Sequence, residues 1–369
     1  ADSEEVGVDP VAKIHEAAFT QPRSDHVHNP RRYHVITSAQ GFANHWQARI
    51  HYYWWKKQRD ACLLQEVCDM GGFTRLLHSG EADDLMDEIP TVVVDPLPKS
   101  AFGKSDTSYI VLNRPYAFME WLKKASIPEH YLVMCEGDHL FLRPMPNMMA
   151  GQAPGAALFT YINPLNYPEI VRSLIGPVSD VELATVPRIG NSPTFISVKD
   201  MRVLAPLWYN TTMQIFQDDT AHKAWNWVLE MYGFSLATFR AGLQKGLVTH
   251  ENMLAHPPFD TKEVDYKGDP FYLVHLTYPL RYNSTGGFTE DVNSTLWLFD
   301  KRAYNDETGP PPRNLPAPPA VVKNDLAHLI IKMINEATEN IPCWDVYVAN
   351  RTITTACAPS SSTQQSNTA

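Results

Sequence analysis

Short β-rich runs alternate with amphipathic helical patterns along this chain, and this alternation most restricts its fold. A β-rich run at 33–37 ends in a polar loop, and apolar residues then recur every three or four positions over 42–57. A helix starting near Arg114-Pro115 leads into a second buried strand at 131–135. Because strands that alternate with helices form sheets covered on both faces, we expect an α/β fold with a mainly parallel, Rossmann-like sheet flanked by helices.

The rest of the chain continues this pattern. Further strands are predicted at 61–67, 73–77, 91–95, 156–162, 193–198 and 271–277, and further helices at 200–217, 222–243 and about 322–338. We interpret residues 1–30 as an N-terminal arm or stem and 31–305 as the main domain. Residues 306–345 are interpreted as a Pro-rich strap (309–319) with a C-terminal helix, and 346–369 as a tail with a low-complexity, disordered end.

Composition excludes some partners and favours one compartment. The net charge is −10 and no long Lys/Arg run is present, so nucleic acid is not an expected partner. There is no apolar stretch of about eighteen residues, so we expect any membrane anchor to lie upstream of Ala1. N-glycosylation sequons begin at Asn210, Asn283, Asn293 and Asn350, which favours the secretory lumen.

Five cysteines leave at least one thiol unpaired, and their spacing fits no zinc motif. In a secretory lumen, Cys62–Cys68 or Cys343–Cys357 are the expected disulfides. The alternative is that these cysteines are buried free thiols.

The strongest local chemical signal is the segment Glu136-Gly137-Asp138-His139, directly after the predicted strand at 131–135. Two carboxylates two residues apart at a strand end can bind Mn²⁺ or Mg²⁺, and such an ion can bridge the two phosphates of a nucleotide-sugar. His275, in a β-rich run far downstream, is a further candidate ligand and would favour Mn²⁺. The alternatives are an ordinary acidic turn and a core histidine.

Several longer segments carry a resemblance to a known family. They are 73–80, 85–90, 94–98, 109–115, 136–146, 189–193, 227–233 and 274–278, in order over about 32–302. Together they resemble the hydroxyproline O-arabinosyltransferases of plants and green algae. Two positions depart from the family pattern: Gly137 stands where proline is expected, and Pro279 where glycine is expected.

The resemblance implies a GT-A-like glycosyltransferase fold with its catalytic domain at 31–305. It implies transfer of L-arabinofuranose from UDP-β-L-arabinofuranose to hydroxyproline hydroxyls of hydroxyproline-rich proteins, with the donor's anomeric configuration retained. It also implies a type II membrane protein of the Golgi or ER lumen. Retention by double displacement and by front-face attack are both open; we favour front-face attack because no carboxylate stands out as a nucleophile.

Roles can be assigned to individual residues within this framework. The metal ligands are expected to be Asp138, His275 and Glu136, and Glu136 has the alternative role of contacting ribose or metal-bound water. The donor is expected to contact Thr37, Ser38, Arg75, His78, Arg114, Glu136, Asn191 and Ser192. Turn chemistry or surface ion pairs would explain the same residue types without function.

The predicted helix at 222–243 carries one catalytic candidate and both acceptor candidates. Asp138 and Glu230 are the catalytic candidates, and a partly desolvated Glu230 would have a raised pKa suited to proton transfer. Trp225 and Trp227 are candidates for an aromatic platform that binds a Pro-rich acceptor, although tryptophans in a helix are more often core residues.

Two rival functions remain open at this point. One is a peptidyl-serine galactosyltransferase, and the other is a non-catalytic module that binds Pro-rich chains. A hydrolase is disfavoured because the sequence has neither a Gly-x-Ser-x-Gly elbow nor a His-Glu-x-x-His helix.

Overall fold

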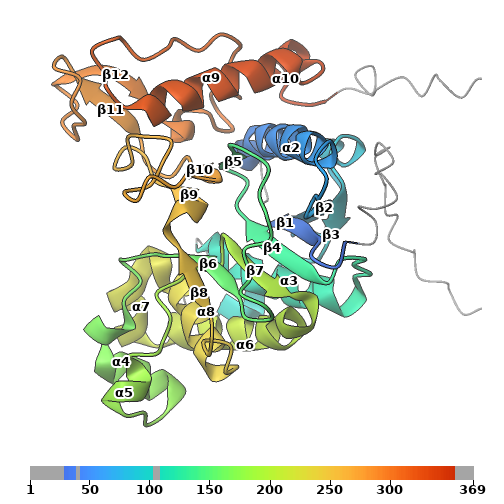
Figure 1. Cartoon of the computed structure of the whole chain (residues 1–369), viewed down its shortest axis with the longest axis vertical. Helices are drawn as coiled ribbons and strands as arrows, with labels where there is room; N and C mark the ends of the chain where they lie inside the picture. Colours follow the sequence, from blue (N-terminus) through green and yellow to red (C-terminus); the bar gives the residue numbers. More distant parts are fainter. Residues whose placement is uncertain (1–28, 39–41, 103–108, 354–369) are drawn as a thin grey trace, which may run out of the picture.

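A computed structural model describes residues 29–38, 42–102 and 109–353 of the chain (Figure 1). Its centre is a seven-stranded sheet in the order β3-β2-β1-β4-β7-β6-β8. The strands are β1 (Tyr33–Ser38), β2 (Met70–Leu77), β3 (Thr91–Val93), β4 (Tyr131–Cys135), β6 (Gly155–Ala157), β7 (Thr194–Ser197) and β8 (Val248–His250). Neighbours pair in parallel except at β7, which is antiparallel to both β4 and β6. The expectation of a mainly parallel sheet is therefore confirmed.

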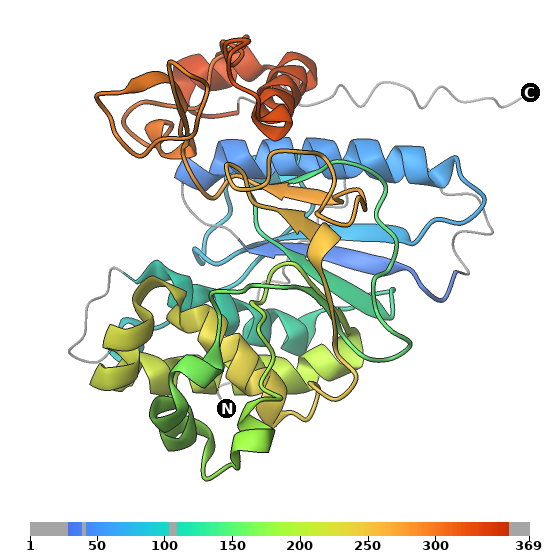
Figure 2. The same ribbon diagram turned by 60° about the vertical axis from the view of Figure 1, so that its left-hand side comes forward.

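Helices cover both faces of this sheet (Figure 2). One face packs against α2 (Phe42–Leu63), and the other packs against α3 (Asn113–Lys124), α6 (Val198–Gln217) and α8 (Leu229–Arg240). In β4, Val133 belongs to the hydrophobic cluster on the α2 side, whereas Leu132 and Met134 belong to the cluster on the α3–α6 side. Because both faces of β4 are buried, its sequence is a continuous run of apolar residues.

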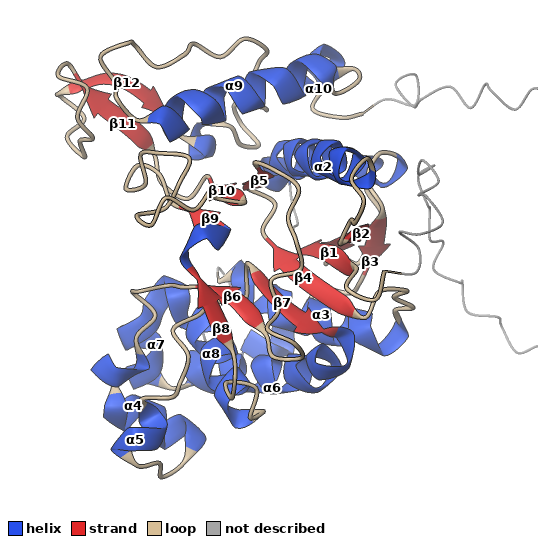
Figure 3. Ribbon diagram, in the orientation of Figure 1, coloured by secondary structure: helices blue, strands red, loops and turns tan. Residues whose placement is uncertain are grey.

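The remaining elements lie beyond this core (Figure 3). The helices are α4 (Pro168–Ile175), α5 (Asp180–Leu183), α7 (Asp219–Trp225), α9 (Asp325–Asn340) and α10 (Trp344–Asn350). A small sheet consists of β5 (His139–Phe141), β10 (Leu273–His275) and β9 (Leu254–Ala255). A hairpin consists of β11 (Leu280–Asn283) and β12 (Thr295–Phe299). Short 3₁₀ turns occur at Asp84–Asp87, Lys99–Phe102, Ile110–Leu112, Pro164–Asn166, Asn226–Val228, Glu251–Met253 and Lys301–Ala303.

Three sequence expectations about these elements were wrong. The predicted strand at 61–67 does not exist, because α2 continues to Leu63 and a turn follows. The strand predicted over 156–162 ends at Ala157. The helix predicted over 222–243 is interrupted after Trp225, where Asn226 has a φ of 40°, a backbone conformation that an α-helix does not contain.

The C-terminal elements pack onto α2 through a Pro-rich segment and a long helix. Residues 309–319 have no regular secondary structure and are hydrogen-bonded to the helices beside them. The Trp344 indole donates to the Pro311 carbonyl at 2.8 Å, and the Leu315 amide donates to Asn335 Oδ1 at 2.7 Å. The segment therefore lies against α9 and α10 and is not a free linker.

The cysteine pairing is confirmed where the structure describes it. Cys62 and Cys68 form a disulfide that closes the turn after α2. Cys343 is also disulfide-bonded, and its expected partner Cys357 lies outside the described residues, as do most of the predicted arm and the end of the tail. Cys135 is free and buried.

Surface features bear on the expected compartment. Three sequon asparagines, Asn210, Asn293 and Asn350, are exposed, whereas the Asn283 side chain is half-buried and accepts hydrogen bonds from its own turn. Within the described part of the chain, no helix has the length and apolarity needed to cross a bilayer.

Candidate active site

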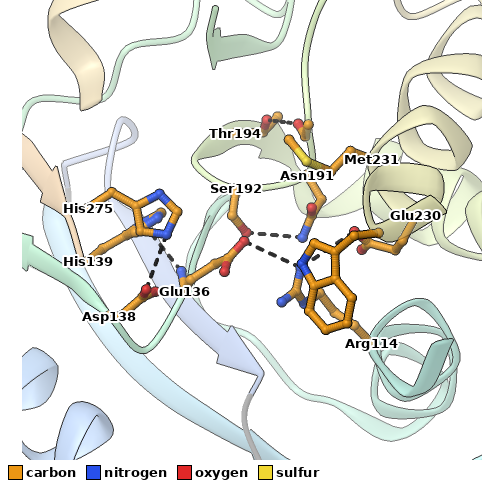
Figure 4. Close-up of polar contacts among 12 residues, drawn as sticks. Arg114, Glu136, Asp138, His139, Asn191, Ser192, Thr194, Glu230, Met231 and His275 are labelled. Carbon is orange, nitrogen blue, oxygen red and sulfur yellow. Dashed lines mark hydrogen bonds and ion pairs between the residues drawn. The ribbon is translucent and has the colours of Figure 1, made fainter. Parts of the chain in front are cut away.

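Asp138, His139 and His275 form a compact group at the carboxyl end of β4 (Figure 4). The chain turns after Cys135 and enters β5, which pairs antiparallel with β10 so that His139 lies opposite His275. The two imidazole rings are 4.5 Å apart, and Asp138 Oδ2 lies 3.2 Å from His275 Nε2. The strand pairing therefore brings together residues that are far apart in the sequence, including the predicted pair Asp138 and His275.

The donor atoms of this group suit a divalent cation. Asp138 is buried, which alone would raise its pKa, but Lys301 and His275 together hold that pKa well below its usual range. The carboxylate is therefore ionised, as a metal ligand must be. Nδ1 of His275 has no hydrogen-bond partner among the described residues, which is unusual for a buried polar atom.

His139 was not singled out from the sequence. Burial lowers its pKa well below the usual value, so the ring is neutral. Its Nδ1 accepts a hydrogen bond from the Glu136 amide at 3.3 Å, which leaves the hydrogen on Nε2. Ligation through Nε2 would therefore need the other tautomer, and Asp138 and His275 fit a metal better than His139 does.

A cleft opens beside this group, and most of its lining residues are polar. It is lined by Ser38, Asn44, Gln47, His78, Ile110, Val111, Arg114, Glu136, Gly137, Asp138 and Lys301. Five of these, Ser38, His78, Arg114, Glu136 and Asp138, were predicted as site residues. The lining combines carboxylates with the cations Arg114 and Lys301, so it can bind a group that is both anionic and metal-associated.

Lys301 is a cleft residue that the sequence analysis missed. It lies in the 3₁₀ turn after β12, and its ammonium forms an ion pair with the Asp138 carboxylate. No local motif distinguishes this lysine from other surface lysines. Only the tertiary structure, which brings the turn after β12 next to Asp138, reveals its position.

Arg114 links two carboxylates at the other side of the cleft. Its Nη1 lies 3.4 Å from Glu136 Oε1 and 3.5 Å from Glu230 Oε2. Glu136 thus faces Arg114 and is not part of the Asp138–His139–His275 group, contrary to its expected role as a metal ligand. Burial raises the pKa of Glu230 to about 7, and this is the net result after Arg114 lowers it and Glu136 raises it.

Polar side chains from three other segments contribute to the site or lie near it. The hydroxyls of Thr37 and Ser38 at the end of β1 have no hydrogen-bond partner among the described residues. Burial lowers the pKa of His78 to about 4, so this cleft residue is neutral. Asn191 donates to Ser192 Oγ at 3.1 Å, and both side chains are buried at the start of β7.

Two predicted site residues lie elsewhere. The buried Arg75 guanidinium is held by the Asp83 carboxylate and by Thr91 Oγ1, 2.9 Å away, and it does not line the cleft. Trp225 is a core residue that stacks on Tyr232 with ring centroids 4.2 Å apart. The structure therefore places both side chains away from the cleft, because sequence pattern does not reveal which partner a polar or aromatic side chain meets.

Trp225 and Trp227 do not form a common platform. The break at Asn226 separates them, so Trp225 points into the core while the Trp227 side chain is 66% exposed. Trp227 contacts Tyr109 edge-on, with ring centroids 5.6 Å apart. It remains a candidate acceptor contact by itself.

Known protein families and individual proteins resemble this chain over most of its length. The hydroxyproline O-arabinosyltransferase family N-terminal domain model matches residues 33–247, and the C-terminal domain model of the same family matches 272–345. The hydroxyproline O-arabinosyltransferase RDN2 of Medicago truncatula is 44% identical over 330 residues, covering 87% of this chain and 85% of that protein. Hydroxyproline O-arabinosyltransferase 3 of Arabidopsis thaliana is 42% identical over 322 residues, covering 86% and 83%.

More distant similarities were also found. A peptidyl serine alpha-galactosyltransferase of Arabidopsis thaliana is 25% identical over 227 residues, covering 56% of this chain and 27% of that protein. The crystal structure of the galactosyltransferase LgtC with donor and acceptor sugar analogs aligns with a TM-score of 0.38 at 11% identity, covering 71% of this chain and 91% of that chain. The extent and identity of the first matches show that this chain belongs to the hydroxyproline O-arabinosyltransferase family of glycosyltransferases.

Proposed function

We propose that this enzyme transfers L-arabinofuranose from UDP-β-L-arabinofuranose to the hydroxyl of hydroxyproline in hydroxyproline-rich polypeptides, with a divalent cation and with retention of configuration. The observation that carries the proposal is the cleft that Asp138 lines together with Arg114 and Lys301, with His275 in contact with the Asp138 carboxylate. A nucleotide-sugar is the substrate class that such a cleft suits, because its diphosphate is both multiply charged and metal-binding.

Asp138 and His275 are the residues proposed to hold the cation. A carboxylate with an imidazole favours Mn²⁺ over Mg²⁺. When bound, the ion would act as a Lewis acid that offsets the charge of the departing diphosphate.

Arg114 and Lys301 are proposed to bind the diphosphate oxygens directly. Both cations line the cleft, and both contact carboxylates of the site, which hold their charges in place. Charges fixed before the reaction stabilise a leaving group without reorganisation. The buried hydroxyls of Thr37 and Ser38 are proposed to contact the uridine side of the donor, and Asn191 and Ser192 the sugar hydroxyls.

Front-face attack is the proposed route to retention. In that route the leaving phosphate oxygen accepts the proton of the acceptor hydroxyl, so a separate enzyme base is not needed. Glu230 is then a positioning residue, since its carboxylate contacts Arg114 from behind the cleft lining. Asp138 contributes through the cation that it holds.

The proposed compartment is the Golgi or ER lumen, with attachment through a type II membrane anchor. It is supported by the Cys62–Cys68 disulfide and by the exposed sequons, because both are typical of secretory proteins. Occupied sequons in protein purified from a eukaryotic secretory host would support this compartment, and a fully unmodified protein from that host would contradict it.

The decisive experiment measures UDP release with defined donors and a peptide that carries both serine and hydroxyproline. We expect turnover with UDP-β-L-arabinofuranose, loss of turnover with EDTA, and modification of hydroxyproline in the mapped product. Turnover with UDP-galactose and modification of serine would support the rival galactosyltransferase. Peptide binding without turnover of any donor would support the non-catalytic module.

A further inference from the structure

Three aromatic side chains gather on the surface near the candidate active site. They are Phe259, Tyr278 and Phe288, which we call the aromatic cluster. Phe259 lies 5.2 Å from Tyr278 and 5.9 Å from Phe288 between ring centroids, in edge-to-face contacts. Scattered exposed apolar residues are ordinary, but a contiguous group of large rings marks an interaction site.

The rings are exposed although they contact each other. The side chain of Phe259 is 65% exposed, that of Tyr278 38% and that of Phe288 39%. They come from three successive loops, after β9, after β10 and between β11 and β12, which lie on one side of the molecule (Figure 1). A ligand can therefore contact all three segments at once.

The frame beneath Phe259 is fixed by hydrogen bonds. The Phe259 amide donates to the His256 carbonyl at 3.0 Å, and the His256 amide donates to Asp260 Oδ2 at 2.7 Å. Asn324 Nδ2 donates to the Pro258 carbonyl at 3.2 Å. Because hydrogen bonds fix this turn, the Phe259 ring is held in place before a ligand binds. Less conformational entropy is therefore lost on binding.

Two chain segments connect the aromatic cluster with the Asp138–His275 pair. Tyr278 is three residues after His275, and Phe259 is three residues after His256, whose ring lies 5.6 Å from that of His275. Two of the three cluster segments therefore begin at His275 or at a histidine in ring contact with it. A ligand bound across the cluster would lie next to the site where transfer is proposed.

Tyr161 extends this surface toward the cleft. Its side chain is 50% exposed, and its ring lies 5.6 Å from Phe159, which in turn lies 5.6 Å from His256. Its hydroxyl donates to Met231 Sδ at 3.9 Å, and Met231 is the residue after Glu230.

We propose that the aromatic cluster and Tyr161 form the surface on which a polyproline II segment of the acceptor docks while one of its hydroxyproline residues enters the cleft. This inference rests on the proposed function for the class of acceptor. Polyproline II segments bind to grooves lined by aromatic rings, and their extended backbone loses little entropy on binding. The ring centroids of the cluster lie 5.2 and 5.9 Å apart. These separations are larger than the rise of one polyproline II residue, about 3.1 Å, and smaller than the length of one polyproline II turn, about 9 Å.

The test measures binding without any donor sugar. A fluorescent peptide of about nine hydroxyproline residues, three polyproline II turns, is titrated with the enzyme and its anisotropy is followed. We expect Phe259→Ala and Phe288→Ala each to raise the Kd about tenfold, as removal of an aromatic anchor typically does. A Gly-Ser peptide of equal length should bind far more weakly than the hydroxyproline peptide.

The matched control is Tyr266→Ala. Tyr266 is also a strongly exposed aromatic residue of the loop region between β9 and β10, but its hydroxyl donates to Glu251 at 2.9 Å and no ring contact joins it to the cluster in the described part of the chain. We expect the Kd of Tyr266→Ala for the hydroxyproline peptide to stay within about twofold of the wild-type value. Unchanged thermal unfolding of each variant shows that the fold is retained.

Three results would overturn the proposal. The first is a Kd unaffected by Phe259→Ala and Phe288→Ala together with a large increase for Trp227→Ala, which would place the acceptor on Trp227. The second is equal binding of the Gly-Ser peptide. The third is conversion of a dimer to a monomer by Phe259→Ala, seen in sedimentation, with peptide affinity unchanged. Because no donor is present, failure of the arabinofuranose assignment would leave this binding result intact.

Discussion

Replacing Glu230 with glutamine should change how the stability of the enzyme depends on pH. The Glu230 carboxyl is almost fully buried, and its Oε1 has no hydrogen-bond partner among the described residues. The charged groups that face it are Arg114 on α3 and Glu136 after β4, while the Tyr109 hydroxyl also lies close. Burial has a larger effect than these groups and raises the pKa of Glu230 from 4.5 to about 7.

The size of the effect follows from this shift. The unfolded chain loses this proton near pH 4.5, whereas the folded chain keeps it until about pH 7. Between these values the folded state binds more protons than the unfolded state, so the free energy of unfolding falls as pH rises and then levels off. One pKa unit corresponds to about 1.4 kcal/mol, so ionising Glu230 should cost on the order of 3 kcal/mol of stability at pH 8.

Urea unfolding of wild type and Glu230→Gln at a series of pH values measures this difference. We expect the stability of the variant relative to wild type to increase by about 3 kcal/mol between pH 4 and pH 8. Glu169→Gln, a substitution of an exposed carboxylate, is the control and should show a constant difference. Parallel curves for Glu230→Gln and wild type would refute the reasoning, because they would mean that Glu230 titrates as it does in water.

Further predictions concern the metal, a structural ion pair and the core. Asp138→Ala should reduce transfer to background while the fold stays intact, and recovery of turnover with added Mn²⁺ would reject its role. After EDTA treatment, Mn²⁺ should restore UDP release better than Mg²⁺ because His275 is the expected second ligand; equal recovery would contradict a nitrogen ligand. Arg75→Ala should destabilise by about 3–5 kcal/mol, because it leaves the Asp83 carboxylate without its buried partner, and should leave the donor KM unchanged; an increased KM with normal stability would show a donor role. Trp225→Ala should also destabilise by about 3–5 kcal/mol, as seen for buried tryptophans, and a stable variant with weak peptide binding would instead restore its acceptor role.

The order of elements and the chemistry of the acidic segment were available from the sequence. Periodicity located β1, α2, α3 and β4 because strands buried on both faces and helices buried on one face have distinct apolar patterns. The position of Asp138 after a buried strand indicated a ligand site at the sheet edge. His275 was a candidate only in combination with that acidic segment, since a lone histidine in a strand carries no such information.

Tertiary structure decided which side chains meet. The pairing of β5 with β10 places His139 opposite His275, and the turn after β12 places Lys301 next to Asp138. The same packing assigns Arg75 to Asp83 and Trp225 to the core, although sequence pattern allowed both to be site residues. Local sequence fixes backbone preference and which face of an element is apolar, but contacts between distant segments depend on how whole elements pack, and the active site of this enzyme is built from such contacts.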